Sequence, residues 1–156
     1  MISPQVPESR SPAEPMVTAR AIIYTGPQRI VESLPHLDHV VDCLDFRDPD
    51  AGSLRQHSGL HPQIRARTRQ QDELYSRKKQ DVLQYIFENP IPGNGVSRHE
   101  YRFAAQCRAG RHRSVSFAEE LGIDLREAGM AVNVIHLNDH NWPCVRGRCH
   151  VCRESC

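Results

Sequence analysis

Short apolar runs that alternate with helix-like segments constrain the fold of this chain more than any other feature. Four runs rich in β-branched, aromatic and small apolar residues have the length of strands, and they cover residues 21–26, 39–44, 101–106 and 131–137. Apolar residues at helical spacing predict helices over 70–88 and 113–128. The alternation favours βαβ units, so we expect an α/β fold: a single open three-layer domain with a mostly parallel sheet of about four or more strands.

Local patterns predict finer details of these elements. A short helical turn is expected over residues 28–34, and Pro35 is expected to end it. The continuous apolar run at 39–44 is typical of a strand that is buried on both faces. Pro and Gly at 48–52 predict the start of a long basic loop that reaches Arg69. The two helices are expected to bury these apolar side chains: Leu74, Val82, Tyr85 and Ile86 on the first, and Val115, Ala118, Leu121 and Leu125 on the second.

The two ends of the chain differ in composition from its centre. Residues 1–16 contain four prolines and few apolar side chains, which predicts a disordered tail; the α/β domain is expected over 17–141, followed by a Cys-rich tail over 142–156. No run approaches the roughly 20 apolar residues of a membrane span, and the N-terminus lacks the pattern of a secretion signal. We therefore expect a cytoplasmic protein with reduced thiols and no membrane partner.

The segment Cys-Arg-Ala-Gly-Arg-His-Arg-Ser at 107–114 joins a predicted strand to a predicted helix. In open α/β sheets ligands bind beyond the carboxyl ends of the strands, and the start of a helix offers backbone N–H groups to an anion. Gly110 permits a close approach of the backbone, and the planar fork of Arg113 can hold two phosphate oxygens. An ordinary βα turn with solvent-facing arginines is the alternative. The favoured prediction is a phosphate-binding loop with these candidate ligand residues: Cys107, Gly110, Arg111, His112, Arg113 and Ser114.

The same loop also has the C-x5-R-[ST] spacing of the cysteine-dependent phosphatases. In that alternative Cys107 would be the nucleophile, Arg113 would hold the transferring phosphoryl group and Ser114 would assist departure of the thiol. Gln106 stands where those phosphatases carry His, and nothing resembles their Trp-Pro-Asp acid loop. Binding without catalysis is therefore favoured, and the question whether the protein is an enzyme stays open.

A broader resemblance links the chain to the C-terminal domain of the RapZ family, the bacterial RNase adapter proteins. The family's Cys-x-Gly-Gly-x-His-Arg-Ser-Val loop and following Ala-Glu-x-Leu are similar to residues 107–115 and 118–121. Its aspartate-led strand resembles residues 42–49, its Leu-Arg-x-x-Thr-Gly-Leu stretch resembles 54–60, and the His that ends its last strand is matched by His136. The resemblance implies an α/β domain that binds an amino-sugar phosphate, with His136 among the ligand residues, and that acts as a sensor or adapter for small RNAs.

The chain departs from that family at several positions. Leu44 and Leu137 stand where family members carry Arg, and Ala109 replaces the first Gly of the loop. Family members usually carry a P-loop kinase-like domain, but no Gly-Lys of a Walker A loop is present, so nucleotide hydrolysis is not expected. The expected ligand is therefore a phosphorylated small molecule of the sugar-phosphate class, with its identity and the oligomeric state left open.

Basic residues gather in the middle of the sequence although the net charge is only +1. Eighteen of the twenty basic residues are Arg, the side chain best suited to phosphate oxygens. A solvated loop and helix face would explain the cluster equally well. The candidate RNA-binding residues are Arg55, Arg65, Arg67, Arg69, Arg77, Lys78 and Lys79.

Four cysteines crowd the last thirteen residues: Cys144, Cys149, Cys152 and Cys156. With His150 they offer enough soft ligands for a tetrahedral zinc ion, and the Cys149-x2-Cys152 pair has zinc-knuckle spacing. A cluster of redox-active thiols and a plain tail are the alternatives. No other cofactor is expected.

Overall fold

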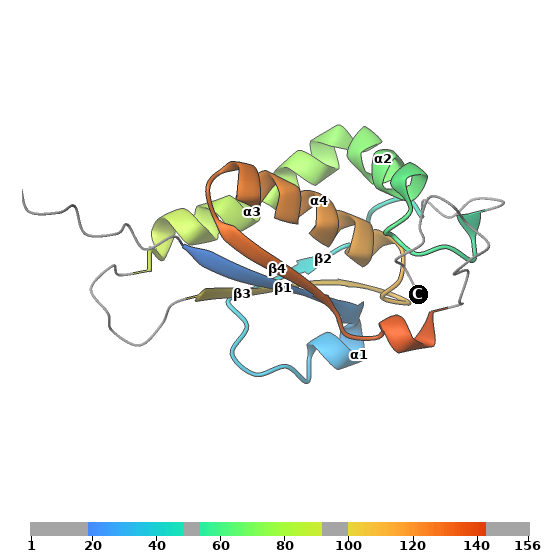
Figure 1. Cartoon of the computed structure of the whole chain (residues 1–156), viewed down its shortest axis with the longest axis horizontal. Coiled ribbons are helices and arrows are strands. Elements are labelled where there is room, and N and C mark those ends of the chain that lie inside the picture. Colours follow the sequence, from blue (N-terminus) through green and yellow to red (C-terminus); the bar gives the residue numbers. More distant parts are fainter. Residues whose placement is uncertain (1–18, 49–53, 92–99, 143–156) are drawn as a thin grey trace, which may run out of the picture.

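A computed structural model describes residues 19–48, 54–91 and 100–142 of the 156-residue chain (Figure 1). Its centre is a sheet of four parallel strands in the order β2-β3-β1-β4. The strands are β1 (Arg20–Pro27), β2 (His39–Asp42), β3 (Glu100–Cys107) and β4 (Ala131–His136). The predicted α/β architecture with a parallel sheet of four strands is confirmed, and all four carboxyl ends meet at one edge.

Helices cover the two faces of the sheet unequally. On one face lie α3 (Asp72–Glu88) and α4 (Arg113–Glu127), with α2 (Pro62–Gln70) packed beside them (Figure 1). The other face carries the single turn of α1 (Gln28–Val31), and a 3-10 turn (Asp139–Asn141) follows β4. Among the described residues, no helix is long and apolar enough to cross a membrane.

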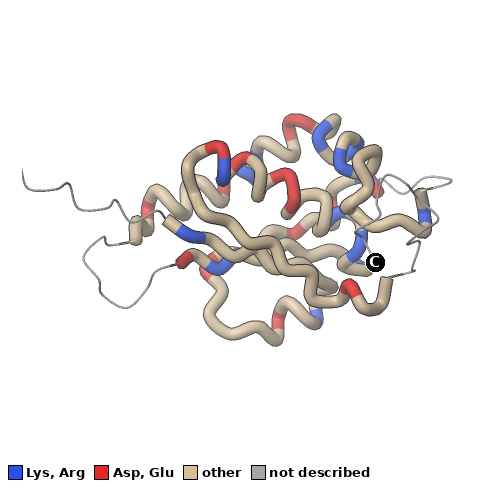
Figure 2. Tube along the Cα trace, viewed as in Figure 1, with Lys and Arg blue, Asp and Glu red and all other residues tan. Residues whose placement is uncertain are grey.

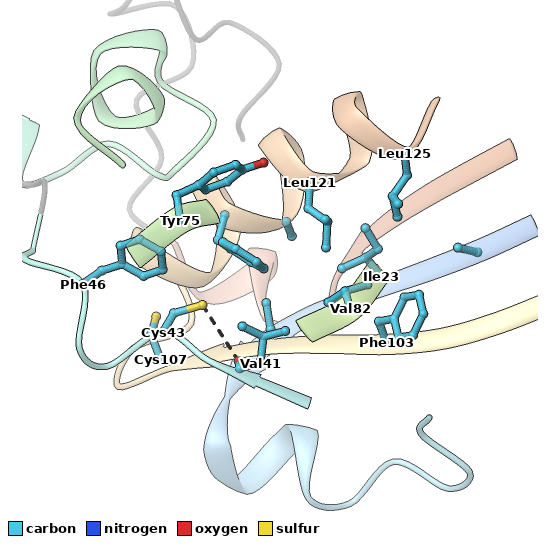
Figure 3. Packing of buried hydrophobic residues seen from close by; sticks show 14 of the residues in the cluster. Ile23, Val41, Cys43, Phe46, Tyr75, Val82, Phe103, Cys107, Leu121 and Leu125 are labelled. Carbon is cyan, nitrogen blue, oxygen red and sulfur yellow. Dashed lines mark hydrogen bonds between the residues drawn. The ribbon is translucent and has the colours of Figure 1, made fainter. Parts of the chain in front are cut away.

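The core lies between the sheet and the two long helices (Figure 3). Side chains alternate along the strands, so Ile23 of β1 and Phe103 of β3 point to this layer and are at most 1% exposed. Helical spacing brings Val82 of α3 and Leu121 and Leu125 of α4 to the same layer. The apolar stripe predicted for the second helix is therefore confirmed.

The prediction that the second strand is buried on both faces is wrong. Val41 is 5% exposed, whereas its neighbour Val40 is 40% exposed on the opposite face. The reason is topological, because β2 is an edge strand and the long helices cover only one face of the sheet. An apolar run alone does not distinguish one covered face from two.

The long basic loop predicted up to Arg69 is also wrong, because its second half is helix α2. Pro62 occupies the first turn, where its missing N–H is harmless, and His61 Nδ1 accepts a hydrogen bond from the Gln63 N–H at 3.1 Å. Ile64 and Thr68, four residues apart, are buried toward α4. The helix therefore buries one apolar side chain and one threonine, whose hydroxyl lies 2.6 Å from Ser116 Oγ, rather than a long apolar stripe.

Basic positions on α2 lie next to acidic positions on α4 (Figure 2), and ion pairs and hydrogen bonds attach α2 and α3 to α4. Glu120 accepts hydrogen bonds from Arg65 at 2.6 Å and from Arg69 at 2.7 Å. Asp124 accepts from Arg69 at 2.7 Å and from the Tyr75 hydroxyl at 2.8 Å. Burial alone would raise the pKa of Asp124, but these donors hold it below its usual value.

Acid should therefore weaken the fold through Asp124. Its pKa is lower in the folded than in the unfolded chain, so its contribution to stability is present above the ordinary value of 3.8 and is lost as the pH falls through the folded value. The variant Asp124→Asn should be less stable at pH 7 and should lose less stability between about pH 4 and pH 2. Urea unfolding followed by circular dichroism at several pH values measures both effects. If the free energy of unfolding changed with pH equally in the two proteins, Asp124 would not be the source of the acid sensitivity.

Candidate functional site

A pocket of about 550 Å³ opens at the carboxyl edge of the sheet, where β1 and β3 end and where the chain leaves β2. Cys107 and Arg108, at the start of the loop that leads into α4, form one side of it. Residues from all three strand exits line it: Pro27, Gln28, Arg29, Leu44, Gln106, Cys107, Arg108 and Arg113.

The pocket is strongly positive. Arg29 and Arg108 are exposed on its rim, Arg113 is half-buried, and the described residues that line it include no carboxylate. Arg113 Nη1 donates to the Leu44 carbonyl at 2.8 Å and to the Phe46 carbonyl at 3.3 Å. These two bonds hold the guanidinium across the end of β2, so it is fixed before any ligand arrives.

Gly110 sets the shape of the loop. Its φ of 61° is left-handed, and a Cβ there would lie 2.5 Å from both the Gly26 carbonyl carbon and the Pro27 nitrogen. Only glycine permits this contact, so the loop lies directly on the end of β1. Asn138 adds a second attachment, because its Nδ2 donates to the Ala109 carbonyl at 2.9 Å.

Cys107 and Ser114 face each other across the base of the loop. The Cys107 thiol donates to Ser114 Oγ at 3.2 Å, and the two residues are 4% and 0% exposed. Cys107 ends β3 and Ser114 lies in the first turn of α4, so this bond ties the strand to the helix. Of these two predicted ligand residues, Cys107 lines the pocket and Ser114 lies behind it.

Arg111 and His112 are not among the residues that line the pocket. Arg111 Nη2 donates to the Arg55 carbonyl at 2.8 Å, and His112 Nε2 donates to the His57 carbonyl at 2.6 Å. Gly59 packs so closely that a Cβ there would lie 2.3 Å from the His112 carbonyl oxygen. These two side chains attach the 107–114 loop to residues 54–61. Their contact with a ligand remains a prediction.

His136 also lies outside the pocket lining. Its Nδ1 is 2.7 Å from Thr25 Oγ1, and its Nε2 is 2.9 Å from Glu119 Oε1. Burial alone would raise the pKa of Glu119, but the hydrogen bond and charge of His136 lower it below its usual value. The imidazole thus links β1, β4 and α4, and a role in ligand binding stays a prediction.

Most of the predicted RNA-binding residues form ion pairs with acidic side chains. Besides Arg65 and Arg69, Lys79 lies 3.3 Å from Asp124. On the other side of α3, Lys78 lies 2.8 Å and Arg77 3.8 Å from Asp45, which forms part of the chain after β2. The remaining two residues are Arg55, whose carbonyl accepts from Arg111, and Arg67, which is half-buried on α2.

Several pocket residues were not among the predicted ligand residues. Gln28 and Arg29 follow the central strand β1, so the rule that ligands bind at strand ends was the signal that could have found them. Arg108 lies within the 107–114 loop itself. Leu44 and Gln106 line the same pocket because β2 pairs with β3, with Asp42 opposite Gln106. This strand order cannot be read from the sequence.

The metal prediction falls outside the described residues, since Cys144, Cys149, Cys152 and Cys156 all lie beyond residue 142. Within 19–48, 54–91 and 100–142 no group of three His, Cys, Asp or Glu side chains could hold a metal ion. Zinc binding by the tail therefore stays a prediction.

Replacing Gly110 by Ala should disrupt the loop. The left-handed backbone alone costs a non-glycine residue roughly 1–2 kcal/mol, and the contact with backbone at 2.5 Å adds to that. Gly129→Ala is the matched control, since Gly129 also has a positive φ of 93° but has open space around it. Denaturant unfolding should show a larger loss of stability for Gly110→Ala, and equal losses would contradict the close packing on β1.

Comparison with known proteins shows the family to which the chain belongs. Residues 30–140 match the family model described as the RapZ C-terminal domain. A protein named nucleotide-binding protein from Frankia casuarinae is 36% identical over 104 residues, which cover 64% of this chain and 34% of that protein. Its namesake from Erythrobacter litoralis is 31% identical over 108 residues, which cover 67% of this chain and 35% of that protein.

The chain spans about a third of the length of these relatives. The family match covers β2, β3, β4 and the helices α2, α3 and α4, together with the whole loop at 107–114. The chain therefore belongs to the RapZ C-terminal domain family.

Proposed function

We propose that this domain binds a phosphorylated small molecule, of the sugar-phosphate class, in the pocket at the carboxyl edge of the sheet. The observation that carries the proposal is the convergence of Arg29, Arg108 and Arg113 on one pocket beside a helix start. A guanidinium fork matches the geometry of phosphate oxygens, and a lining without carboxylates among the described residues leaves this charge for a ligand.

The remaining lining residues suit a small ring with hydroxyl groups that is attached to the phosphate. Leu44 and Pro27 offer apolar surface to the carbon face of a ring, and Gln28 and Gln106 offer hydrogen-bonding groups to hydroxyls. The volume of about 550 Å³ lies within the range of roughly 300–1,000 Å³ that is usual for small-molecule sites. The curated relatives are named nucleotide-binding proteins, so a nucleotide is the ligand class to compare against a sugar phosphate.

Binding is favoured over phosphatase chemistry. No Asp or Glu that could serve as the acid is among the described residues that line the pocket, and Gln106 stands where those phosphatases carry His. Turnover of an aryl phosphate that Cys107→Ser abolishes would instead establish the phosphatase.

A sensor or adapter role with RNA as partner extends this proposal. The ion pairs of Arg65 and Arg69 with Glu120 and Asp124 reduce the positive potential of that surface, so the geometry supports RNA binding less than phosphate binding. Contact with RNA phosphates would give an affinity that falls steeply with salt. An affinity that does not respond to salt, or no retention of RNA at low salt, would remove the RNA partner.

Calorimetry tests the ligand proposal directly. A hexosamine phosphate should release heat on binding, and Arg113→Ala should weaken it by at least about tenfold, because a charge-assisted hydrogen bond is worth roughly 1.5–3 kcal/mol. Arg113→Lys should restore little of the loss, since a lysine cannot form the paired bonds.

Arg20→Ala is the matched control, because Arg20 begins β1 at the opposite, amino end of the sheet. It should bind like the wild type. Inorganic phosphate, other sugar phosphates and a nucleoside monophosphate complete the series. No heat from any of them with folded protein, or an equal loss in Arg20→Ala, would overturn the proposal.

A further inference from the structure

Two cysteines lie next to each other where β2 and β3 reach the pocket (Figure 3). The two strands pair in parallel with Asp42 opposite Gln106. The Cys43 N–H donates to the Gln106 carbonyl at 2.8 Å, so the pairing continues by one residue. Cys43 therefore lies opposite Cys107.

Both side chains point to the same face of the sheet. Val41 and Ala105 are paired two residues earlier and are buried in the core, and the period of two brings Cys43 and Cys107 to that side again. Neighbouring strands lie about 4.7–4.9 Å apart. This spacing falls inside the range of about 4.4–6.8 Å found between the Cα atoms of disulfide-bonded cysteines. A bond between the two sulfurs thus requires little movement of the backbone.

The two thiols differ in access and in reactivity. Cys107 lines the pocket, whereas Cys43 is fully buried. Burial, followed by the neighbouring Cys107, raises the pKa of Cys43 well above its usual value, and Lys78 only partly opposes this. The Cys43 thiol makes a weak contact of 3.9 Å with the Val41 carbonyl. A small oxidant that enters the pocket therefore meets Cys107 first, and Cys43 can turn toward it.

We propose that Cys43 and Cys107 form an oxidative modification site that closes to a disulfide when the protein meets a hydroperoxide such as hydrogen peroxide. In the first step the Cys107 sulfur attacks one oxygen of hydrogen peroxide, the O–O bond breaks, the thiol proton passes to the leaving oxygen, and Cys107 sulfenic acid and one water form. In the second step the Cys43 sulfur attacks the sulfenic sulfur, the S–O bond breaks, and the disulfide and a second water form. Two thiols are oxidised and one peroxide is reduced.

The disulfide would also change the pocket. A sulfur bonded to Cys43 can no longer donate to Ser114 Oγ, so the 3.2 Å bond between the end of β3 and the first turn of α4 is lost. The start of α4 is the part of the site that holds Arg113, and phosphate affinity should fall. This consequence rests on the proposed function, whereas formation of the disulfide does not.

Peptide mapping of the full chain tests the linkage separately from binding. After brief treatment with equimolar hydrogen peroxide, free thiols are blocked with N-ethylmaleimide and the protein is digested with trypsin under non-reducing conditions. Cys43 is then in peptide 30–47 and Cys107 in peptide 103–108, and neither contains another cysteine. Mass spectrometry should find the two peptides joined in most molecules, and a reducing agent should separate them.

Two kinds of variant sharpen this result. In Cys43→Ser, or in Cys43→Ala if the serine disturbs the core, the joined peptide should vanish, and a second equivalent of hydrogen peroxide should oxidise the Cys107 sulfenic acid to sulfinic acid with release of one water. Replacement of the four cysteines in 142–156 by serine should leave the link in place. Recovery of peptides 30–47 and 103–108 mainly in unlinked form from peroxide-treated, folded wild type, or sulfinic acid as the main product at Cys107 in the wild type, would overturn the proposal.

Calorimetry with inorganic phosphate then measures the consequence for binding. The oxidised wild type should bind at least about tenfold more weakly than the reduced protein, and reduction should restore the affinity. Equal affinity in a fully linked sample would overturn the coupling. If the reduced protein binds no phosphate at all, the proposed function fails, while the peptide map still decides the linkage.

Discussion

The packing of Gly110 against the backbone of Gly26 and Pro27 is the contact on which the site depends. It holds the loop after β3 on the end of the central strand β1, at a distance that no side chain would permit. With the loop in that place, Arg108 and Arg113 line the same pocket as Arg29 from the turn after β1. A chemical site thus arises from a steric constraint on a single residue.

The basic residues of α2 and α3 and those of the pocket have different surroundings. On α2 and α3 the basic side chains meet Glu120, Asp124 and Asp45, and these pairs attach the helices to α4 and to the chain after β2. In the pocket, the described lining residues include three arginines and no carboxylate. Attraction for a phosphate should therefore concentrate at the carboxyl edge of the sheet, even though the sequence as a whole is nearly neutral.

The sequence predicts the strands and the long helices well, because apolar periodicity follows directly from burial on one side. It also places Cys107, Gly110 and Arg113 in one loop. Helix α2 is not predicted because Ile64 and Thr68 are its only buried side chains, and its arginines suggest a solvated loop. Arg29 is not predicted as a pocket residue because its place in the pocket depends on strand order, which is a property of the tertiary structure.

Backbone amide NMR during titration with a hexosamine phosphate tests the central claim most directly. The account predicts saturable shifts in the amides of 107–114, of 27–29 and of Leu44, because these segments surround the pocket. Shifts of the same size should be absent from α2 and α3. Saturable shifts confined to α2 and α3, or none at all in the folded protein, would contradict the account.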